Sequence, residues 1–157
     1  MIPSTTSTRA GFTLIEILIV VTMIGLLAAI AVPAFGKLNT RSQNTAFVND
    51  LRIASEAVQR YALENGGWPP DGGGGLPNEL TGYLPPPDRW TIPTPVGGLW
   101  GFTASTLPTE FKATLIVTGY GGGSKRASDL DNQLDDGDSA TGFLRTDGTK
   151  LTYVLEP

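Results

Sequence analysis

The feature that most limits how this chain can fold is an apolar run near its N-terminus. Residues Phe12 to Phe35, FTLIEILIVVTMIGLLAAIAVPAF, make a stretch of 24 residues with a single charge, at Glu16. A helix of about 20 apolar residues is long enough to cross the hydrocarbon core of a bilayer. The run therefore predicts one membrane-spanning helix, preceded by a short, hydroxyl-rich segment (residues 1–11) whose one charge is Arg9.

The helix is expected to continue beyond the apolar run, because no turn-forming cluster follows it. Apolar residues at steps of three and four then place a stripe on one face of the helix; they are Phe47, Leu51, Ala54, Val58 and Tyr61. Asn65-Gly66-Gly67 supplies a stop. The sequence thus predicts one helix from about Phe12 to Glu64, roughly 80 Å long at 1.5 Å per residue. Pro33 lies within it and predicts a kink, since proline donates no backbone hydrogen bond.

The residues after the helix predict a small antiparallel sheet. Proline and glycine in WPPDGGGGLP indicate a loop, and Pro77–Gly82 favours a single helical turn. Strands are predicted at about Leu99–Thr103 and Phe111–Thr118, and Asp147-Gly148 between two strand-like runs is typical of a hairpin. The predicted fold class is α+β, a long N-terminal helix packed against a small antiparallel β-sheet head, with the three tryptophans as core anchors.

Four segments follow from this pattern. Residues 1–11 are a leader, 12–36 the apolar half of the helix, 37–65 its amphipathic half, and 66–157 a β-rich globular head.

Composition excludes several kinds of function. The chain has no cysteine and no histidine, so it lacks disulfides and the commonest zinc ligands and general bases. Its formal net charge is -4, which leaves no basic stripe for nucleic acid on the head. An enzyme would therefore have to work with carboxylates, lysines and hydroxyls, and the chain is predicted not to be an enzyme. Nucleic-acid binding by the isolated head is disfavoured.

The residues Gly11-Phe12-Thr13-Leu14-Ile15-Glu16, leading into the apolar run, resemble the processing site of type IV pilins and type II secretion pseudopilins. Pro33 also falls where such pilins carry a proline. The resemblance covers about Thr8 to Phe35 closely and the rest of the helix in general character. The head matches only in its layout of helix, loop and short antiparallel sheet.

The resemblance implies that a membrane-embedded prepilin peptidase cuts between Gly11 and Phe12 and then methylates the new amine of Phe12. It implies that Glu16 meets the Phe12 amine of a neighbouring subunit during assembly. A carboxylate one turn into a membrane helix costs a few kcal/mol unless it has a partner, which agrees with that role. The implied partners are other pilin-like subunits, the peptidase, a powering ATPase and an inner-membrane assembly platform.

The implied location is the cytoplasmic (inner) membrane as a single-pass chain with an extracytoplasmic head, and then a filament. Two features depart from the family pattern. Lys37 and Arg41 follow the apolar run, so the positive-inside rule does not orient the chain by itself. A C-terminal cysteine pair is also absent, which favours a pseudopilin-like or minor subunit. An ordinary secretory signal cut near Ala31 is the alternative interpretation of the N-terminus.

An acidic stretch is the candidate chemical site of the head. Its carboxylates have the density of oxygen ligands that suits calcium; they belong to Asp129, Asp131, Asp135, Asp136 and Asp138. The spacing does not fit an EF-hand loop, and a solvated turn is the competing interpretation.

Function has three interpretations on the sequence alone. The first is a filament subunit of a type IV pilus or a type II secretion pseudopilus. The second is a monomeric, membrane-anchored module that binds a ligand outside the membrane. The third is an anchored hydrolase that uses Asp135, Asp136 or Asp138 as acid and base, which no nucleophile motif accompanies.

Overall fold

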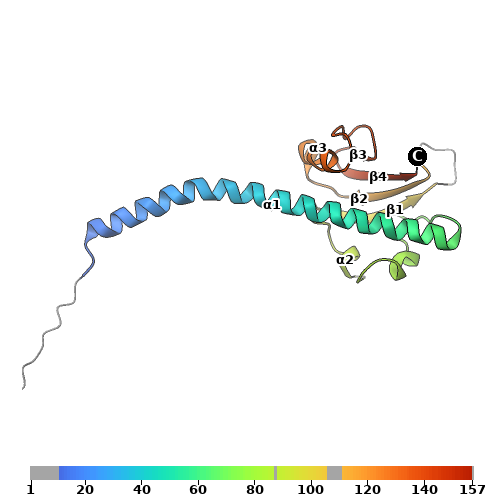
Figure 1. Cartoon of the computed structure of the whole chain (residues 1–157), viewed down its shortest axis with the longest axis horizontal. Coiled ribbons are helices and arrows are strands. Elements are labelled where there is room, and N and C mark those ends of the chain that lie inside the picture. Colours follow the sequence, from blue (N-terminus) through green and yellow to red (C-terminus); the bar gives the residue numbers. More distant parts are fainter. Residues whose placement is uncertain (1–10, 87, 106–110, 157) are drawn as a thin grey trace, which may run out of the picture. The chain divides into compact units, whose positions relative to one another are not determined.

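The computed structural model describes residues 11–86, 88–105 and 111–156. Within these ranges a long N-terminal helix and two short helices come before a sheet, and a further helix lies between the second and third strands (Figure 1). They are α1 (Leu14–Asn65), the 3-10 helix η1 (Asn78–Gly82), α2 (Asp88–Thr91), β1 (Leu99–Ala104), β2 (Ala113–Thr118), α3 (Gly123–Leu134), β3 (Leu144–Thr146) and β4 (Lys150–Glu156).

The continuous helix predicted from the sequence is confirmed as α1, which has 52 residues. It ends where Gly66 takes a φ of 72° and the Asn65 side-chain amide donates to the Tyr61 carbonyl, 2.9 Å away. A positive φ is accessible to glycine at little cost, so this is the expected end of a helix. Pro33 lies inside α1 without ending it, and the kink at Pro33 stays a prediction.

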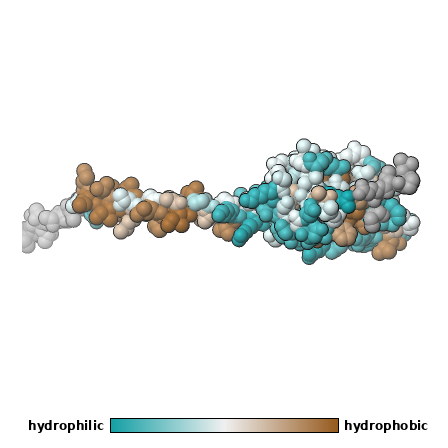
Figure 2. Space-filling view, turned by 90° about the horizontal axis from the view of Figure 1, so that it is seen from above, coloured by the Kyte–Doolittle hydropathy of each residue, from teal (hydrophilic) through white to brown (hydrophobic). Residues whose placement is uncertain are grey.

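Helix α1 contributes to two compact units, of which the first ends at Thr40 and the second begins at Arg41. In the first unit the apolar residues of α1 are exposed, and Figure 2 shows hydrophobic colour along this part of the helix. Its most apolar stretch has a mean hydropathy of 2.7, and the helix is long and apolar enough to cross a membrane. No residue of this stretch is buried within the chain.

The second unit contains a four-stranded antiparallel sheet with the order β1-β2-β4-β3. Strands β3 and β4 form the predicted hairpin. In its turn, Asp147 Oδ1 accepts the N–H groups of Thr149 and Lys150 at 2.9 and 2.8 Å, and Gly148 supplies the positive φ that the turn requires. Strand β1 and the glycine-rich loop are joined by two hydrogen bonds, from Gly72 N–H to Phe102 O and from Phe102 N–H to Gly75 O.

The core of this unit lies between the sheet and the apolar stripe of α1. Phe47, Leu51, Ala54 and Val58 are buried there, and Tyr61 packs against them, so the predicted stripe is confirmed. The Phe47 ring stacks on Trp100 with 5.3 Å between centroids. Trp90 and Trp100 are buried core residues and Trp68 is partly buried, which confirms their predicted role as core anchors.

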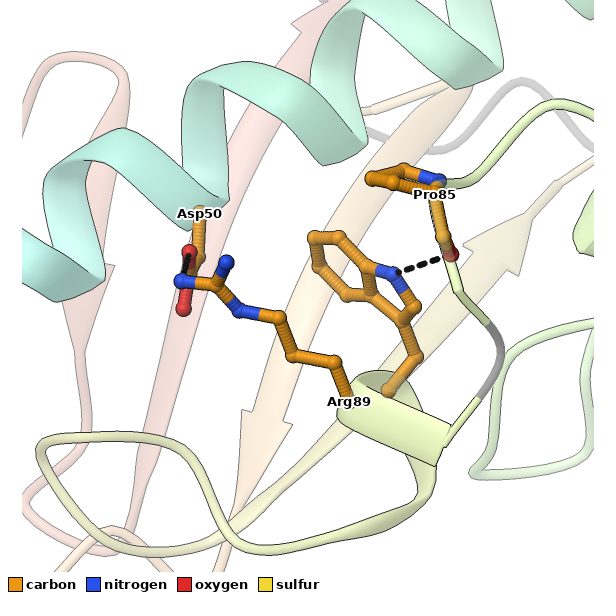
Figure 3. Close-up of polar contacts among 4 residues, drawn as sticks. Asp50, Pro85 and Arg89 are labelled. Atoms are coloured by element: carbon orange, nitrogen blue, oxygen red, sulfur yellow. Dashed lines mark hydrogen bonds and ion pairs between the residues drawn. The ribbon is translucent and has the colours of Figure 1, made fainter.

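A partly buried ion pair joins α2 to α1. Asp50 on α1 accepts a hydrogen bond from Arg89 Nη2, while Trp90 Nε1 donates to the Pro85 carbonyl at 3.2 Å (Figure 3). Asp50 is buried and the Arg89 side chain is half exposed. Burial raises the pKa of the Asp50 carboxyl more than Arg89 lowers it. Asp50 is therefore a buried polar residue of α1 that does not belong to the predicted apolar stripe.

Helix α3 corrects the sequence analysis, which predicted no helix between the strand ending at Thr118 and the hairpin. The helix begins at Gly123 and includes the first half of the acidic stretch. Its apolar side follows helical spacing through Ala127, Leu130 and Leu134. Glycine and aspartate are poor helix formers, so packing of this face on the core decides the structure over local propensity.

Candidate functional site

The residues of the N-terminal motif form the start of α1. Thr13 precedes the first helical residue and accepts the Glu16 N–H with its hydroxyl oxygen, 3.3 Å away. Its carbonyl accepts the N–H groups of Glu16 and Ile17 at 3.2 and 3.3 Å. Thr13 is therefore the N-cap of α1, in the Thr-x-x-Glu spacing of a capping box. The sequence analysis overlooked this role, although the spacing alone could have indicated it.

Gly11, Phe12 and Glu16 are all exposed. A Cβ atom added to Gly11 meets no atom within 4 Å, so nothing in the packing of the described chain requires glycine there. No Lys or Arg of the described residues forms an ion pair with Glu16. The carboxylate sits in the first turn, where the helix dipole favours a negative charge. These side chains are thus open to an enzyme or to another molecule.

Two hydroxyl groups in the first part of α1 donate hydrogen bonds within the helix itself. The Thr22 hydroxyl donates to the Ile19 carbonyl at 2.8 Å, and the Thr40 hydroxyl to the Gly36 carbonyl at 3.1 Å. Gly25 is a small residue in the apolar surface, and a Cβ added there meets nothing within 4 Å. Such a surface is suited to lipid or to other helices of the same kind.

In the acidic stretch the structure brings three of the five predicted carboxylates together. Asp131, Asp135 and Asp136 each offer an oxygen, and these atoms lie within 4.8 Å of one another. Asp129 is exposed on α3 and Asp138 Oδ1 accepts the Ala140 N–H, 3.1 Å away, so these two stand outside the group. Asp131 is fully buried, which contradicts the solvated turn at that position.

Three comparisons with known proteins bear on the N-terminal motif and the fold. Residues 6–32 match the family described as the prokaryotic N-terminal methylation motif. Fimbrial protein EcpC of Eikenella corrodens is 46% identical over 63 residues, which cover 40% of this chain and 41% of that protein. The type IV major pilin protein PilE of Neisseria gonorrhoeae is 41% identical over 63 residues, covering 40% of this chain and 38% of the relative. The chain therefore matches about two fifths of the length of these relatives.

Among solved structures, the major type IV pilin PilA1 from Clostridium difficile matches with a TM-score of 0.56 and 16% identity, over 77% of this chain and 98% of that chain. At this identity the likeness concerns the fold alone. The N-terminal motif and the helix that follows it are thus similar to those of type IV pilins. The fold, a long helix packed against a small antiparallel sheet, is similar to that of a solved type IV pilin.

Proposed function

We propose that this protein is a structural subunit of a type IV pilus-like filament and that it works by assembly. The observation that carries the proposal is the apolar first part of α1, whose most apolar stretch has no buried residue. This part of the helix carries Glu16 in its first turn and lies within a matching methylation motif. An apolar surface of this length needs lipid before assembly and other helices after it. No catalytic step is part of the proposal.

Processing precedes assembly in this proposal. A prepilin peptidase cuts between Gly11 and Phe12, and the new amine of Phe12 is methylated. The exposure of both residues supports access by such an enzyme. Glu16 then pairs with the Phe12 amine of a neighbouring subunit, because a carboxylate among apolar helices needs a positive partner. The capping hydrogen bond to Thr13 uses the backbone N–H of Glu16. The side-chain carboxylate of Glu16 takes no part in that bond and is available for the pairing.

The partners and location follow from this pathway. Other pilin-like subunits, the peptidase and an inner-membrane assembly platform are the proposed partners. Before assembly, the chain spans the cytoplasmic membrane once, with its head on the extracytoplasmic side. The named relatives are pilus proteins, which favours a pilus over a type II secretion pseudopilus as the filament.

The second candidate is an anchored module that stays monomeric and binds a ligand with its head. It shares the membrane helix but assigns no role to Glu16 beyond the first turn of α1. Replacing Glu16 therefore separates the two candidates.

The test is intact-mass spectrometry of the chain isolated from its own membrane, together with electron microscopy of sheared filaments. Wild type is expected to begin at methylated Phe12. Gly11→Ala is expected to stay uncut. Glu16→Ala is expected to be processed and to remain in the membrane, with filaments reduced at least about tenfold by the unpaired amine in the assembly.

Glu56→Ala is the matched control, because Glu56 is an exposed carboxylate on the amphipathic part of the same helix. It is expected to assemble normally. A chain cut near Ala31, or an uncut wild type, refutes the pilin pathway. Normal filaments from Glu16→Ala refute the assembly role of Glu16, and a processed wild type that never forms filaments supports the anchored module.

A further inference from the structure

A group of three carboxylates lies at the C-terminal end of α3. It is separate from the N-terminal motif. Asp131 lies on the last turns of the helix, and Asp135 and Asp136 follow its end. No Lys or Arg of the described residues forms an ion pair with any of them. Three like charges within 4.8 Å repel one another unless something of opposite charge lies between them.

Asp131 is the unusual member of the group. It is 0% exposed, and neither carboxylate oxygen accepts a hydrogen bond from the described part of the chain. It shares the buried side of α3 with Ala127 and Leu130. A buried carboxylate without a partner is strongly unfavourable. Burial first, and then the charge of Asp136, raise the pKa of this carboxyl.

The other two carboxylates are held in place by the loop that leads to β3. Asp135 Oδ2 accepts the Phe143 N–H at 2.6 Å, and Asp136 Oδ1 accepts the Asp138 N–H at 2.8 Å. Gly142 makes room for Asp135, because a Cβ at that position falls 1.9 Å from Asp135 Oδ2. Each of these two carboxylates is therefore held in place through one oxygen. Its other oxygen takes no part in these two hydrogen bonds.

We propose that Asp131, Asp135 and Asp136 bind a calcium ion that joins the end of α3 to the loop before β3. The three side chains offer carboxylate oxygens, which hard divalent cations prefer. Calcium accepts irregular sets of six to eight oxygens, so backbone carbonyls and water complete its shell, whereas magnesium demands a near-ideal octahedron. The ion supplies the missing partner of Asp131. Asp129 and Asp138 are not ligands in this site.

The test uses the full chain in a non-ionic detergent after removal of metals with EDTA. CaCl₂ is titrated by calorimetry, and thermal unfolding is followed by near-ultraviolet circular dichroism with and without CaCl₂. Wild type is expected to bind one calcium ion and to unfold at a higher temperature in its presence. MgCl₂ is expected to bind at least about tenfold more weakly, because of its stricter geometry.

Asp131→Asn keeps the shape of the buried side chain and removes its charge, so it is expected to weaken calcium binding about 100-fold or more. In EDTA it is expected to unfold at a higher temperature than wild type, since an uncompensated buried charge is gone. Asp129→Asn, an equal change in charge at an exposed position two residues away, is the matched control and is expected to bind calcium like wild type.

Asp136→Asn alters an exposed carboxylate and serves if Asp131→Asn does not fold; it is also expected to lose calcium binding. Absence of binding to wild type at millimolar CaCl₂ overturns the proposal and means that the carboxyls share protons instead. Equal calcium affinity of wild type and both site variants overturns it too.

Discussion

Asp50 shows how one residue links the stability of the head to pH. Its carboxylate is buried against the core, and its partner Arg89 keeps half of its side chain in solvent. The ion pair therefore replaces only part of the hydration that Asp50 loses, and the pKa of its carboxyl is raised above 3.8. The folded chain then holds this proton more tightly than the unfolded chain does.

The sign of the resulting pH dependence follows from proton linkage. A raised pKa in the folded state means that stability is lost as pH rises through that pKa. Asp50→Asn carries no such proton, so its free energy of unfolding is expected to gain on that of wild type between about pH 4 and pH 7. Urea unfolding of the full chain in detergent, followed by tryptophan fluorescence at several pH values, measures the difference. The exposed Glu56→Gln serves as control, and a flat difference for Asp50→Asn contradicts the expectation.

Single residues differ in how well the sequence reveals them. Glu16 could be singled out as a candidate functional residue because it is the single charge in an apolar run. Such an interruption is visible in the sequence alone. Asp50 and Asp131 are buried. Aspartate is usually exposed, so the residue type gave no reason to expect a buried position for either of them. The partner of Asp50 comes from 39 residues further along the chain. No local pattern contains that information.

At the scale of elements, α1 holds the head together through its stripe. Phe47 is 0% exposed and stacks on Trp100 of β1. Phe47→Ala removes this contact and leaves a cavity, so the free energy of unfolding is expected to fall by about 3 to 5 kcal/mol. Leu63 lies on the same helix but is 86% exposed. Leu63→Ala is therefore expected to change stability by less than about 0.5 kcal/mol.

Guanidinium unfolding of both variants in detergent, followed by tryptophan fluorescence, measures these two values. The comparison holds helix and substitution type nearly constant while burial changes. Equal losses in the two variants contradict the packing of the stripe on the sheet. A small loss in both means that the head is stabilised mainly by contacts within the sheet.

Elements with a strong period or a strong turn were predictable. The stripe of α1, the strand-like runs at β1 and β2, and Asp147-Gly148 each indicated their element, and the structure has them within a few residues. Helix α3 was missed because its glycine and aspartate content favours a turn, while two of its three apolar residues at helical spacing fell inside an acidic run. The four-residue α2 is too short to show a period at all.

At the scale of the whole molecule, the two units differ in what they bury. The unit that begins at Arg41 contains the core cluster. The described large apolar residues before Thr40 remain exposed. Folding of one chain therefore buries the apolar core of the head but leaves the apolar surface of the first part of α1 exposed. A protein with this division needs lipid or other copies of its own helix to bury the rest.

Gly25 offers a test in which chain and filament respond in opposite directions. Gly25→Leu adds a side chain where the isolated chain has open space, and leucine is a better helix former than glycine by roughly 0.5 to 1 kcal/mol. Helicity and membrane insertion of the single chain are therefore expected to hold or improve. Filament yield is expected to fall, because small residues let neighbouring helices approach closely and leucine keeps them apart.

Circular dichroism in detergent, carbonate extraction of membranes and the mass of sheared filaments measure the three quantities. Gly25→Ala is the graded control and is expected to give an intermediate yield of filaments. If Gly25→Leu inserts and assembles like wild type, no neighbouring helix comes close at this position, and contacts elsewhere along α1 must hold the subunits together. If insertion itself fails, the loss of filaments says nothing about packing, so the extraction is read first.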